Sequence, residues 1–213
     1  MDLINNKIYD YAEAFSTPVD DVLYQLHRET HLKVMNPIML TGALQGKLLQ
    51  FFSDMMKPRL ILEIGTFTGY SAICLALGLQ KGGMLHTIEI DPELESICKK
   101  YFEKARLQDR ITMHIGDARE VIPTFKQSFD LVYLDCDKEI YPEVYYKVFD
   151  KVAKGGYIIA DNVLWHGKVF EHDAHPDRET AAIKEFNELV KNDERADNFM
   201  LPFRDGLMII KKL

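Results

Sequence analysis

Residues 59–71 read Arg-Leu-Ile-Leu-Glu-Ile-Gly-Thr-Phe-Thr-Gly-Tyr-Ser, and this stretch decides the fold. The apolar run before the first glycine, interrupted only by Glu63, is typical of a buried strand, and the residues from Tyr70 onward have helical spacing. Gly65 and Gly69 allow the turn between them to bend tightly and bring backbone N–H groups close to a ligand. A strand, a glycine turn and a helix in this order predict a nucleotide-binding unit, with a ligand-free turn as the alternative.

The turn is not a dinucleotide-binding loop. Phe67 stands where the Gly-x-Gly-x-x-Gly pattern has its second glycine, which lets a pyrophosphate approach the backbone. NAD and FAD are therefore disfavoured, and no Gly-Lys-Ser/Thr follows that would indicate an ATP-type loop. A nucleoside cofactor without a phosphate fits better, and we expect S-adenosylmethionine (SAM). Glu63 in an apolar strand needs a cationic or hydrogen-bond-donating partner, and the ammonium group of SAM would be one.

Length and charge limit the class of protein. The chain has 213 residues, 47% of them hydrophobic, which suits one domain with a good-sized core. We expect a single domain over 1–213, with an N-terminal helical cap in 1–57 and a Rossmann-like core in 58–213. The net charge is −7 and no polybasic run occurs, which argues against binding nucleic acid or a membrane surface through bulk electrostatics.

Targeting signals and cysteine spacing point to a cytoplasmic location. The N-terminus has no basic region followed by an apolar core, so no secretory signal is expected. No apolar run is long enough to span a bilayer. The three cysteines are far apart and form no Cys-x-x-Cys pair, which favours a reduced protein.

Strands and helices alternate from residue 59 onward, which predicts an α/β fold with a mostly parallel sheet. The predicted strands are 59–64, 84–90, 110–115, 129–134 and 157–160, followed by an antiparallel hairpin of 196–202 and 207–212. Before them, a helix is expected from Thr17, as its cap, to about residue 33, and another over 41–56.

Polar residues follow each strand, and the carboxyl ends of such strands are where ligands bind. Glu89 lies about 20 residues past the glycine turn, where an acid can accept both ribose hydroxyls. Asp117 follows the next strand and would face the adenine. A helix cap or a solvated acid is the alternative for each.

The next two strand ends carry oxygen ligands. The sequence Asp135-Cys136-Asp137-Lys138 follows one strand and Asp161-Asn162 ends the next. Carboxylate and amide oxygens without clustered thiols or imidazoles favour a hard cation, Mg²⁺ above all, with Ca²⁺ or Mn²⁺ as alternatives. Helix capping is the competing interpretation, but Asp161-Asn162 precedes Val-Leu-Trp rather than an obvious helix.

Together these motifs resemble the cation-dependent O-methyltransferases, the family of catechol and caffeoyl-CoA O-methyltransferases and their bacterial relatives. The resemblance covers almost the whole chain and rests on Glu63-x-Gly65-Thr66-Phe67-Thr68-Gly69-Tyr70-Ser71, Ile88-Glu89-x-Asp91-Pro92, Asp135-x-Asp137-Lys138 and Asp161-Asn162-Val163. The Asp-x-Asp-Lys form is similar to the caffeoyl-CoA and bacterial branch, because the animal catechol enzymes carry an aromatic residue at the position of Asp137.

The resemblance implies a seven-stranded sheet, a homodimer formed through the N-terminal helices, and roles for individual residues. Lys138 would be the catalytic residue. The metal ligands would be Asp135, Asp161 and Asn162. The substrate would meet Asp137, Trp165 and Arg204. The cofactor would contact Met39, Thr41, Glu63, Gly65, Thr66, Phe67, Ser71, Glu89, Asp117, Ala118 and Asp135.

Histidines offer weaker metal candidates. The pair His27 and His31 lies four residues apart but has no evident third ligand, so a surface or core role is favoured. The loop 165–177 is expected to be a lid over the substrate, and its histidines 166, 172 and 175 are interpreted as solvated. Trp165 could stack on an aromatic substrate or simply pack.

The expected reaction is methyl transfer from SAM to a hydroxyl of a small aromatic vicinal diol, of the catechol or hydroxycinnamoyl type. The cation would lower the pKa of the attacking hydroxyl. Lys138 would accept the proton if burial and the cation depress its own pKa. The alternatives are a tRNA hydroxyuridine O-methyltransferase, which the net acidity disfavours, and a non-catalytic SAM-binding module, which the retained Lys138 and acids disfavour.

Overall fold

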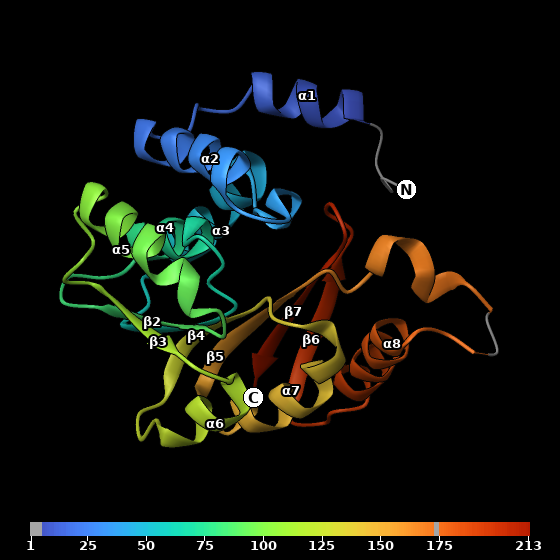
Figure 1. The fold of residues 1–213 in the computed structure, drawn as a ribbon. Helices are drawn as coiled ribbons and strands as arrows, with labels where there is room; N and C mark the ends of the chain where they lie inside the picture. The colour runs from blue at the N-terminus through green and yellow to red at the C-terminus, as the bar shows by residue number, and fades with distance from the viewer. Residues whose placement is uncertain (1–5, 173–174) are drawn as a thin grey trace. The chain divides into compact units, whose positions relative to one another are not determined.

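The computed structural model describes residues 6–172 and 175–213, and its seven strands have the order β3-β2-β1-β4-β5-β7-β6 (Figure 1). Residues 1–5 of the expected helical cap and 173–174 of the expected lid lie outside the described residues. The chain divides into two compact units, which we call the N-terminal unit (6–117) and the C-terminal unit (from Ala118 onward). Within the described ranges, no helix has the length and apolar character needed to cross a membrane.

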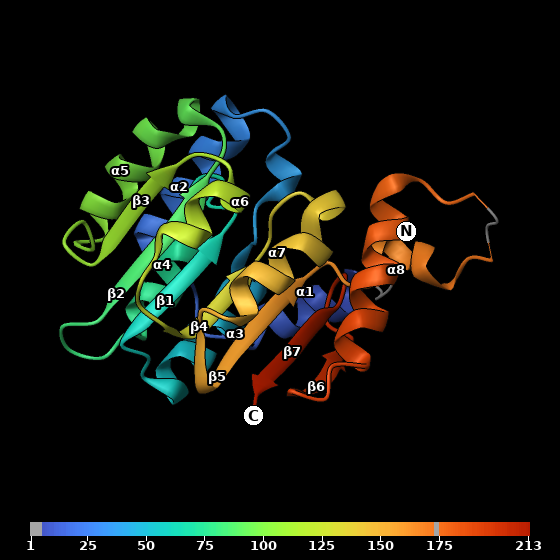
Figure 2. The ribbon, with the colours of Figure 1, turned by 90° about the horizontal axis from the view of Figure 1, so that it is seen from below.

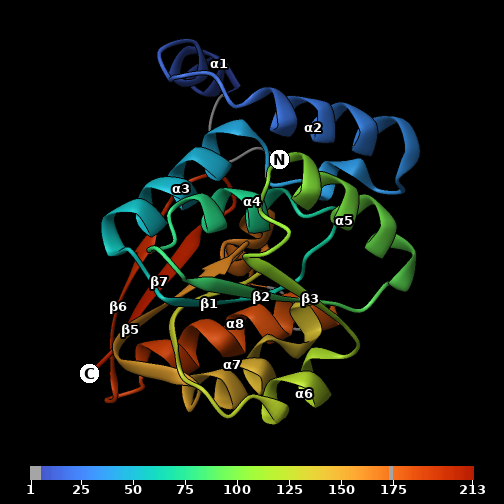
Figure 3. The same cartoon turned by 90° about the vertical axis from the view of Figure 1, so that its left-hand side faces the viewer.

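The N-terminal unit holds three parallel strands and most of the helices. Its elements are α1 (Asn6–Ala14), α2 (Asp21–Lys33), η1 (Pro37–Met39), α3 (Ala43–Met56), β1 (Leu60–Ile64), α4 (Tyr70–Leu77), β2 (Met84–Glu89), η2 (Pro92–Leu94), α5 (Glu95–Lys104) and β3 (Ile111–Ile115). Figure 3 shows α3, α4 and α5 together on one side of β1, β2 and β3. In the register, Glu63 lies beside Thr87 and Leu85 beside Ile111.

Helix α4 forms the centre of this unit. Every residue from Tyr70 to Ala76 is buried, as expected for a helix that is apolar all round. Helix α3 comes close to it at Gly78, where a Cβ atom would lie 2.5 Å from the backbone nitrogen of Asp54. A larger residue at position 78 would force α3 and α4 apart. Gly78 therefore allows α4, the helix that follows the glycine turn, to pack closely against α3.

The predicted start of the second helix is wrong. Helix α2 begins at Asp21, because the carboxylate of Asp20 accepts the backbone N–H of Val22 at 3.0 Å and caps the helix there. Thr17 and Pro18 lie before that cap. They line a cavity of about 490 Å³ together with residues of α1, α2 and α3. The predicted end of the helix near residue 33 is confirmed.

The C-terminal unit contains two parallel strands and the antiparallel hairpin. Its elements are α6 (Ala118–Val121), η3 (Ile122–Thr124), β4 (Phe129–Leu134), η4 (Lys138–Ile140), α7 (Tyr141–Phe149), β5 (Val152–Asp161), η5 (Trp165–Phe170), α8 (Arg178–Lys191), β6 (Ala196–Leu201) and β7 (Leu207–Lys212). Strand β5 is parallel to β4 and antiparallel to β7, which pairs with β6. The predicted hairpin and the predicted fold class are confirmed.

Aromatic packing fixes the helices of this unit. Figure 2 shows α7 and α8 on one face of β4, β5 and β7. Phe186 of α8 makes edge-on contacts with Tyr141 and Tyr145 of α7, with ring centroids 5.3 and 5.7 Å apart. Strand β5 starts at Val152, five residues earlier than predicted, because a shift in its register with β4 lets the strand continue through Gly155 and Gly156.

Candidate active site

The glycine turn in the N-terminal unit is held by hydrogen bonds on both sides of Phe67. This residue has a left-handed backbone, with φ of 49°, which is uncommon for a bulky side chain. Its N–H donates to Oε2 of Glu89 at 2.7 Å, and its carbonyl oxygen accepts from the thiol of Cys98 at 3.2 Å. A left-handed backbone at such a residue costs about 1–3 kcal/mol, so it persists only where the surrounding structure stabilises it. Residues of this kind concentrate at ligand sites.

Glu89 closes the same turn from strand β2. While Oε2 accepts from Phe67, Oε1 accepts the backbone N–H of Asp91 at 2.9 Å. Burial raises the pKa of this carboxyl group, and the backbone donors act in the opposite direction. Each carboxylate oxygen has a second lone pair, so the group can still accept hydrogen bonds from a ligand. The backbone N–H of Gly116 donates to the carbonyl of Glu89, which brings Asp117, the next residue along, to this edge of the strands.

The carboxylate of Glu63 accepts a hydrogen bond from a hydroxyl group of the chain. Its side chain is fully buried, and Oε2 accepts from the hydroxyl of Thr87 at 2.6 Å. Thr87 also forms a hydrogen bond with the hydroxyl of Thr66. The requirement for a donor or cation beside Glu63 is therefore met in part within the chain. The sequence analysis missed Thr87, although a polar residue two positions before Glu89 in an apolar strand was a usable signal.

The remaining cofactor candidates differ in exposure. Ser71 is buried near the start of α4, and Thr41 is buried between η1 and α3. Met39, at the end of η1, has 60% of its surface exposed. Behind the turn, Thr30 of α2 donates its hydroxyl to that of Thr68 at 3.0 Å, and both side chains are fully buried. This contact connects α2 to the turn.

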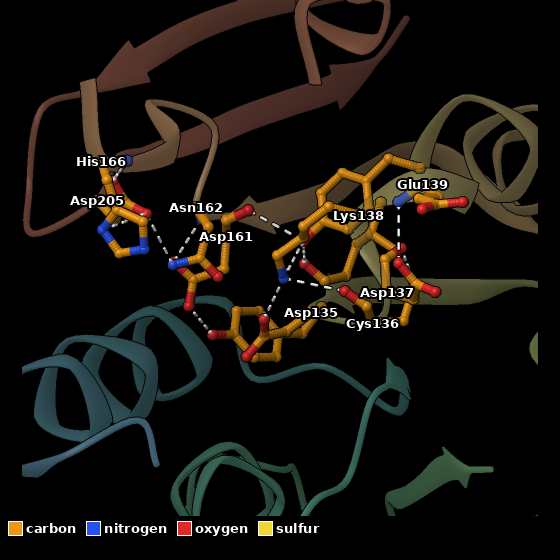
Figure 4. A network of polar contacts seen from close by, with 12 residues as sticks. Asp135, Cys136, Asp137, Lys138, Glu139, Asp161, Asn162, His166 and Asp205 are labelled. Atoms are coloured by element: carbon orange, nitrogen blue, oxygen red, sulfur yellow. Dashed lines mark hydrogen bonds and ion pairs between the residues drawn. The ribbon is translucent and has the colours of Figure 1, made fainter. Parts of the chain in front are cut away.

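In the C-terminal unit, Lys138 is the centre of a buried polar network (Figure 4). Its Nζ donates to Oδ1 of Asp135 at 2.8 Å, to the carbonyl of Cys136 at 3.0 Å and to the hydroxyl of Tyr141 at 3.1 Å. Only 8% of Lys138 is exposed. All three ammonium donor positions therefore have acceptors within the chain.

In the absence of a cation, the charges around Lys138 raise the pKa of its amine. Burial lowers the pKa of the amine, but the charges of Asp135 and Asp161 and the hydrogen bond to Asp135 outweigh burial and raise it. Burial also raises the pKa of Asp135; Lys138 counteracts this rise, and the charge of Asp161 adds to it. The two carboxylates therefore repel each other, and a cation between them would relieve that repulsion.

Strand β5 ends at Asp161. The side chains of Asp161 and of the next residue, Asn162, both form hydrogen bonds. Oδ2 of Asp161 accepts from the hydroxyl of Tyr133 at 2.7 Å, and Oδ1 accepts the backbone N–H of Asn162 at 2.7 Å. Asn162 has a left-handed backbone, with φ of 56°. Its side-chain nitrogen lies 3.4 Å from Oδ2 of Asp205. Because a carboxylate can only accept, this contact turns the amide nitrogen toward Asp205 and leaves the amide oxygen for another partner.

The donor set fits a hard cation better than a zinc-type site. Across residues 6–172 and 175–213, no group of three or more His, Cys, Asp or Glu side chains is arranged to hold a metal. The candidate ligands are two carboxylates and one amide, all oxygen donors of the kind that Mg²⁺ prefers. Magnesium sites commonly use one or two carboxylates and leave the other positions to water or substrate, so the residues present are compatible with this ion.

The segment after β5 contains a sharp left-handed bend. Trp165, His166 and Gly167 have φ of 47°, 54° and 84°. The backbone N–H of His166 donates to Oδ1 of Asp205 at 2.6 Å and fixes the bend. Asp205 was not predicted from the sequence, where only its neighbour Arg204 was given a role beyond the turn.

Other predicted site residues have identifiable local surroundings. Asp137 is exposed and caps η4 by accepting the N–H of Glu139 at 3.0 Å. Arg204, with φ of 51°, lies before Asp205 in the β6–β7 turn, and its charge lowers the pKa of Asp135. Ala118 is the first residue of α6. His166, His172 and His175 are exposed.

Known proteins resemble this chain along nearly its whole length. A sequence model of the family described as O-methyltransferase matches residues 13–213. The catechol O-methyltransferase of Niastella koreensis is 30% identical over 179 residues, which are 80% of this chain and 80% of that protein. The caffeoyl-CoA O-methyltransferase of Stellaria longipes is 29% identical and covers 90% of this chain and 83% of its own length.

A solved structure of a relative has the same fold as this chain. The O-methyltransferase of Bacillus cereus in complex with SAH superimposes with a TM-score of 0.90 at 28% identity, and the match covers 97% of each chain. The glycine turn, the ends of the strands and the match to the family model thus lead to the same conclusion. The chain belongs to the O-methyltransferase family.

Proposed function

We propose that the chain transfers the methyl group of SAM to one hydroxyl of a small aromatic vicinal diol, of the catechol or hydroxycinnamoyl type, in the presence of a divalent cation. One observation carries the proposal: Asp135, Lys138 and Asp161 form a buried network of charges in a chain of the O-methyltransferase family. The retained Lys138 and acids favour catalysis over a non-catalytic SAM-binding module.

The cofactor is proposed to bind to the glycine turn. SAM supplies the electrophilic methyl group. Glu89 accepts the ribose hydroxyls on its free lone pairs, and Glu63 attracts the ammonium group of the methionine part. Further contacts are assigned to Met39, Thr41, Gly65, Thr66, Phe67, Ser71, Asp117, Ala118 and Asp135. The SAH bound to the Bacillus cereus relative supports a ligand of this class.

The cation is proposed to bind to Asp135, Asp161 and Asn162. When bound, Mg²⁺ lowers the pKa of a substrate hydroxyl by stabilising its anion. Asp135 and Asp161 supply the negative charge, and Asn162 supplies an amide oxygen. Ca²⁺ and Mn²⁺ are alternatives with the same ligand preference.

Lys138 is proposed to take the hydroxyl proton at Nζ. The raised pKa of Lys138 favours its ammonium form. A cation bound beside Asp135 would lower this pKa. Asp137, Trp165 and Arg204 are proposed to contact the substrate. The left-handed backbone of the half-buried segment around Trp165 supports a role in enclosing it.

The assembly is proposed to be a cytoplasmic homodimer that does not bind nucleic acid. The N-terminal unit exposes many large apolar side chains, which is typical of an interaction surface. Those before the first strand are Ile8, Tyr11, Phe15, Tyr24, Leu32, Met35, Ile38, Met39, Phe51 and Met55. The net charge of −7 supports the absence of nucleic-acid binding.

Labelled SAM with Mg²⁺ should be offered to catechols, caffeoyl-CoA and bulk tRNA. We expect transfer to a vicinal diol, its loss with EDTA and its recovery with excess Mg²⁺. The variant Asp161→Ala should be inactive but should bind SAH with normal affinity. Transfer to tRNA alone would favour the hydroxyuridine enzyme. Binding of SAM with no turnover on any acceptor would favour the non-catalytic module, and full activity in EDTA would contradict the role of the cation.

A further inference from the structure

Tyr133 is a fully buried residue near the end of β4 that none of the proposed roles uses. Its exposed fraction is 0%, and its hydroxyl donates to Oδ2 of Asp161 at 2.7 Å. Asp161 itself is only 5% exposed. A buried hydroxyl that donates to a buried carboxylate makes a strong, charge-assisted hydrogen bond.

The register of the strands explains how the two side chains meet. Tyr133 of β4 is paired with Ile159 of β5, and Asp161 lies two residues further along β5. Residues two apart in a strand point to the same face, so Tyr133 and Asp161 share one face of the β4–β5 pair. The phenol reaches diagonally to the carboxylate at the end of the strand.

The second oxygen of Asp161 is fixed as well. Oδ1 accepts the backbone N–H of Asn162 at 2.7 Å, so each oxygen has one donor from the chain. Two donors on opposite oxygens restrict rotation of the carboxylate about its Cβ–Cγ bond.

We propose that Tyr133 is a positioning residue, whose hydroxyl holds the carboxylate of Asp161 in the orientation in which it binds the divalent cation. The inference rests on the proposed function, because it assumes that Asp161 is a metal ligand. No direct contact of Tyr133 with the substrate or the cofactor is proposed. Residues that orient a metal ligand typically change metal affinity about 10–100-fold when they are replaced.

A matched control lies in the same unit. Tyr145 of α7 is also fully buried, and its hydroxyl donates to Oδ2 of Asp193 at 3.0 Å. Asp193 is engaged with Arg195 and is not among the proposed ligands. Tyr133→Phe and Tyr145→Phe therefore each remove the hydroxyl of a buried tyrosine that donates to an aspartate. The first contact is buried and the second partly buried, and only the first involves a proposed ligand.

The test is Mn²⁺ binding to the full chain without substrate, measured by calorimetry and by the spin resonance signal of free Mn²⁺. We expect Tyr133→Phe to weaken binding about 10–100-fold and Tyr145→Phe to leave it within about twofold. With saturating cation, Tyr133→Phe should recover most of its kcat, because the effect is on the occupancy of the site. Thermal unfolding without metal should shift by similar amounts in the two variants.

Each other outcome decides against the proposal. Unchanged Mn²⁺ affinity in Tyr133→Phe would overturn it, as would a Tyr133→Phe protein that does not fold while Tyr145→Phe folds, because the hydroxyl would then be purely structural. The proposed function fails in a different way: the wild-type chain would bind no Mn²⁺, or Asp161→Ala would bind it as tightly as the wild type.

Discussion

The backbone N–H of Phe67 donates to the side chain of Glu89 at 2.7 Å, so an acid on one strand holds the glycine turn that follows another. Glu89 fixes the turn, and it is also the residue proposed to accept hydrogen bonds from the ribose of the cofactor. Removing the charge of Glu89 should therefore weaken cofactor binding through both of these contacts.

We predict that Glu89→Gln weakens SAH binding by at least about tenfold, since hydrogen bonds to charged groups contribute about 1.5–3 kcal/mol. Calorimetric titration with SAH measures the effect. The control is Glu93→Gln, an exposed acid four residues further on, which should bind SAH normally. Equal affinity in the two variants would contradict a cofactor role for Glu89.

Asp205 should control the segment after β5. We predict that Asp205→Ala lowers kcat/KM about tenfold or more, because the N–H of His166 loses its charged acceptor and the amide of Asn162 loses an orienting partner. The segment 163–172 should become more sensitive to limited proteolysis. Asp197→Ala, at an exposed position of β6, is the control. Wild-type protection and activity in Asp205→Ala would rule out this role.

Acid should destabilise the chain through Glu29. This residue of α2 accepts hydrogen bonds from Lys100 and Tyr101 of α5 and from Lys33, which lower the pKa of its carboxyl group to about 2. The folded pKa is below the ordinary value of 4.5, so the stabilisation is present above pH 4.5 and is lost as the pH falls toward 2.

We therefore predict that Glu29→Gln flattens the loss of stability between about pH 4.5 and 2, measured by urea unfolding at a series of pH values. At pH 7 the variant should be less stable than the wild type. Glu103→Gln, an exposed residue of α5, should leave the acid limb unchanged. A pH profile for Glu29→Gln that is parallel to that of the wild type would show that Glu29 does not contribute.

The exposed apolar side chains of α1 predict association in solution. Tyr11 and Phe15 are 66% and 76% exposed and stack on each other with ring centroids 4.4 Å apart. If the chain is a dimer through this surface, Tyr11→Glu combined with Phe15→Glu should produce a monomer in light scattering. Tyr146→Glu, an exposed aromatic residue of α7, should not change the mass. A dimer that survives the double substitution would exclude α1 from the interface.

The sequence predicted the order of the elements and the residues at the strand ends well, because both depend on local pattern. The strand that ends at Ile64 and the hairpin around Gly206 both follow from spacing and turn chemistry. The start of α2 was wrong because two adjacent stretches, at Thr17 and at Asp20, both had the composition of a cap. Local pattern cannot choose between them.

The partners of the site residues could not be predicted in the same way. Thr87 beside Glu63, Tyr133 beside Asp161 and Asp205 beside Asn162 all depend on which residues of neighbouring strands lie opposite each other. That register is set by packing over the whole sheet. The pKa of Lys138 without a cation could not be predicted either, because it depends on the contact with Asp135.

The position of Asp205 has a consequence for how this enzyme can diversify. One carboxylate at the tip of the β6–β7 turn is shared between the proposed metal ligand Asn162 and the bend at His166. A change in the length or sequence of that turn would alter the lining of the substrate region and the orientation of the ligand together. Variants that accept new substrates should therefore arise more readily from Trp165, which lies outside that turn, than from Asp205.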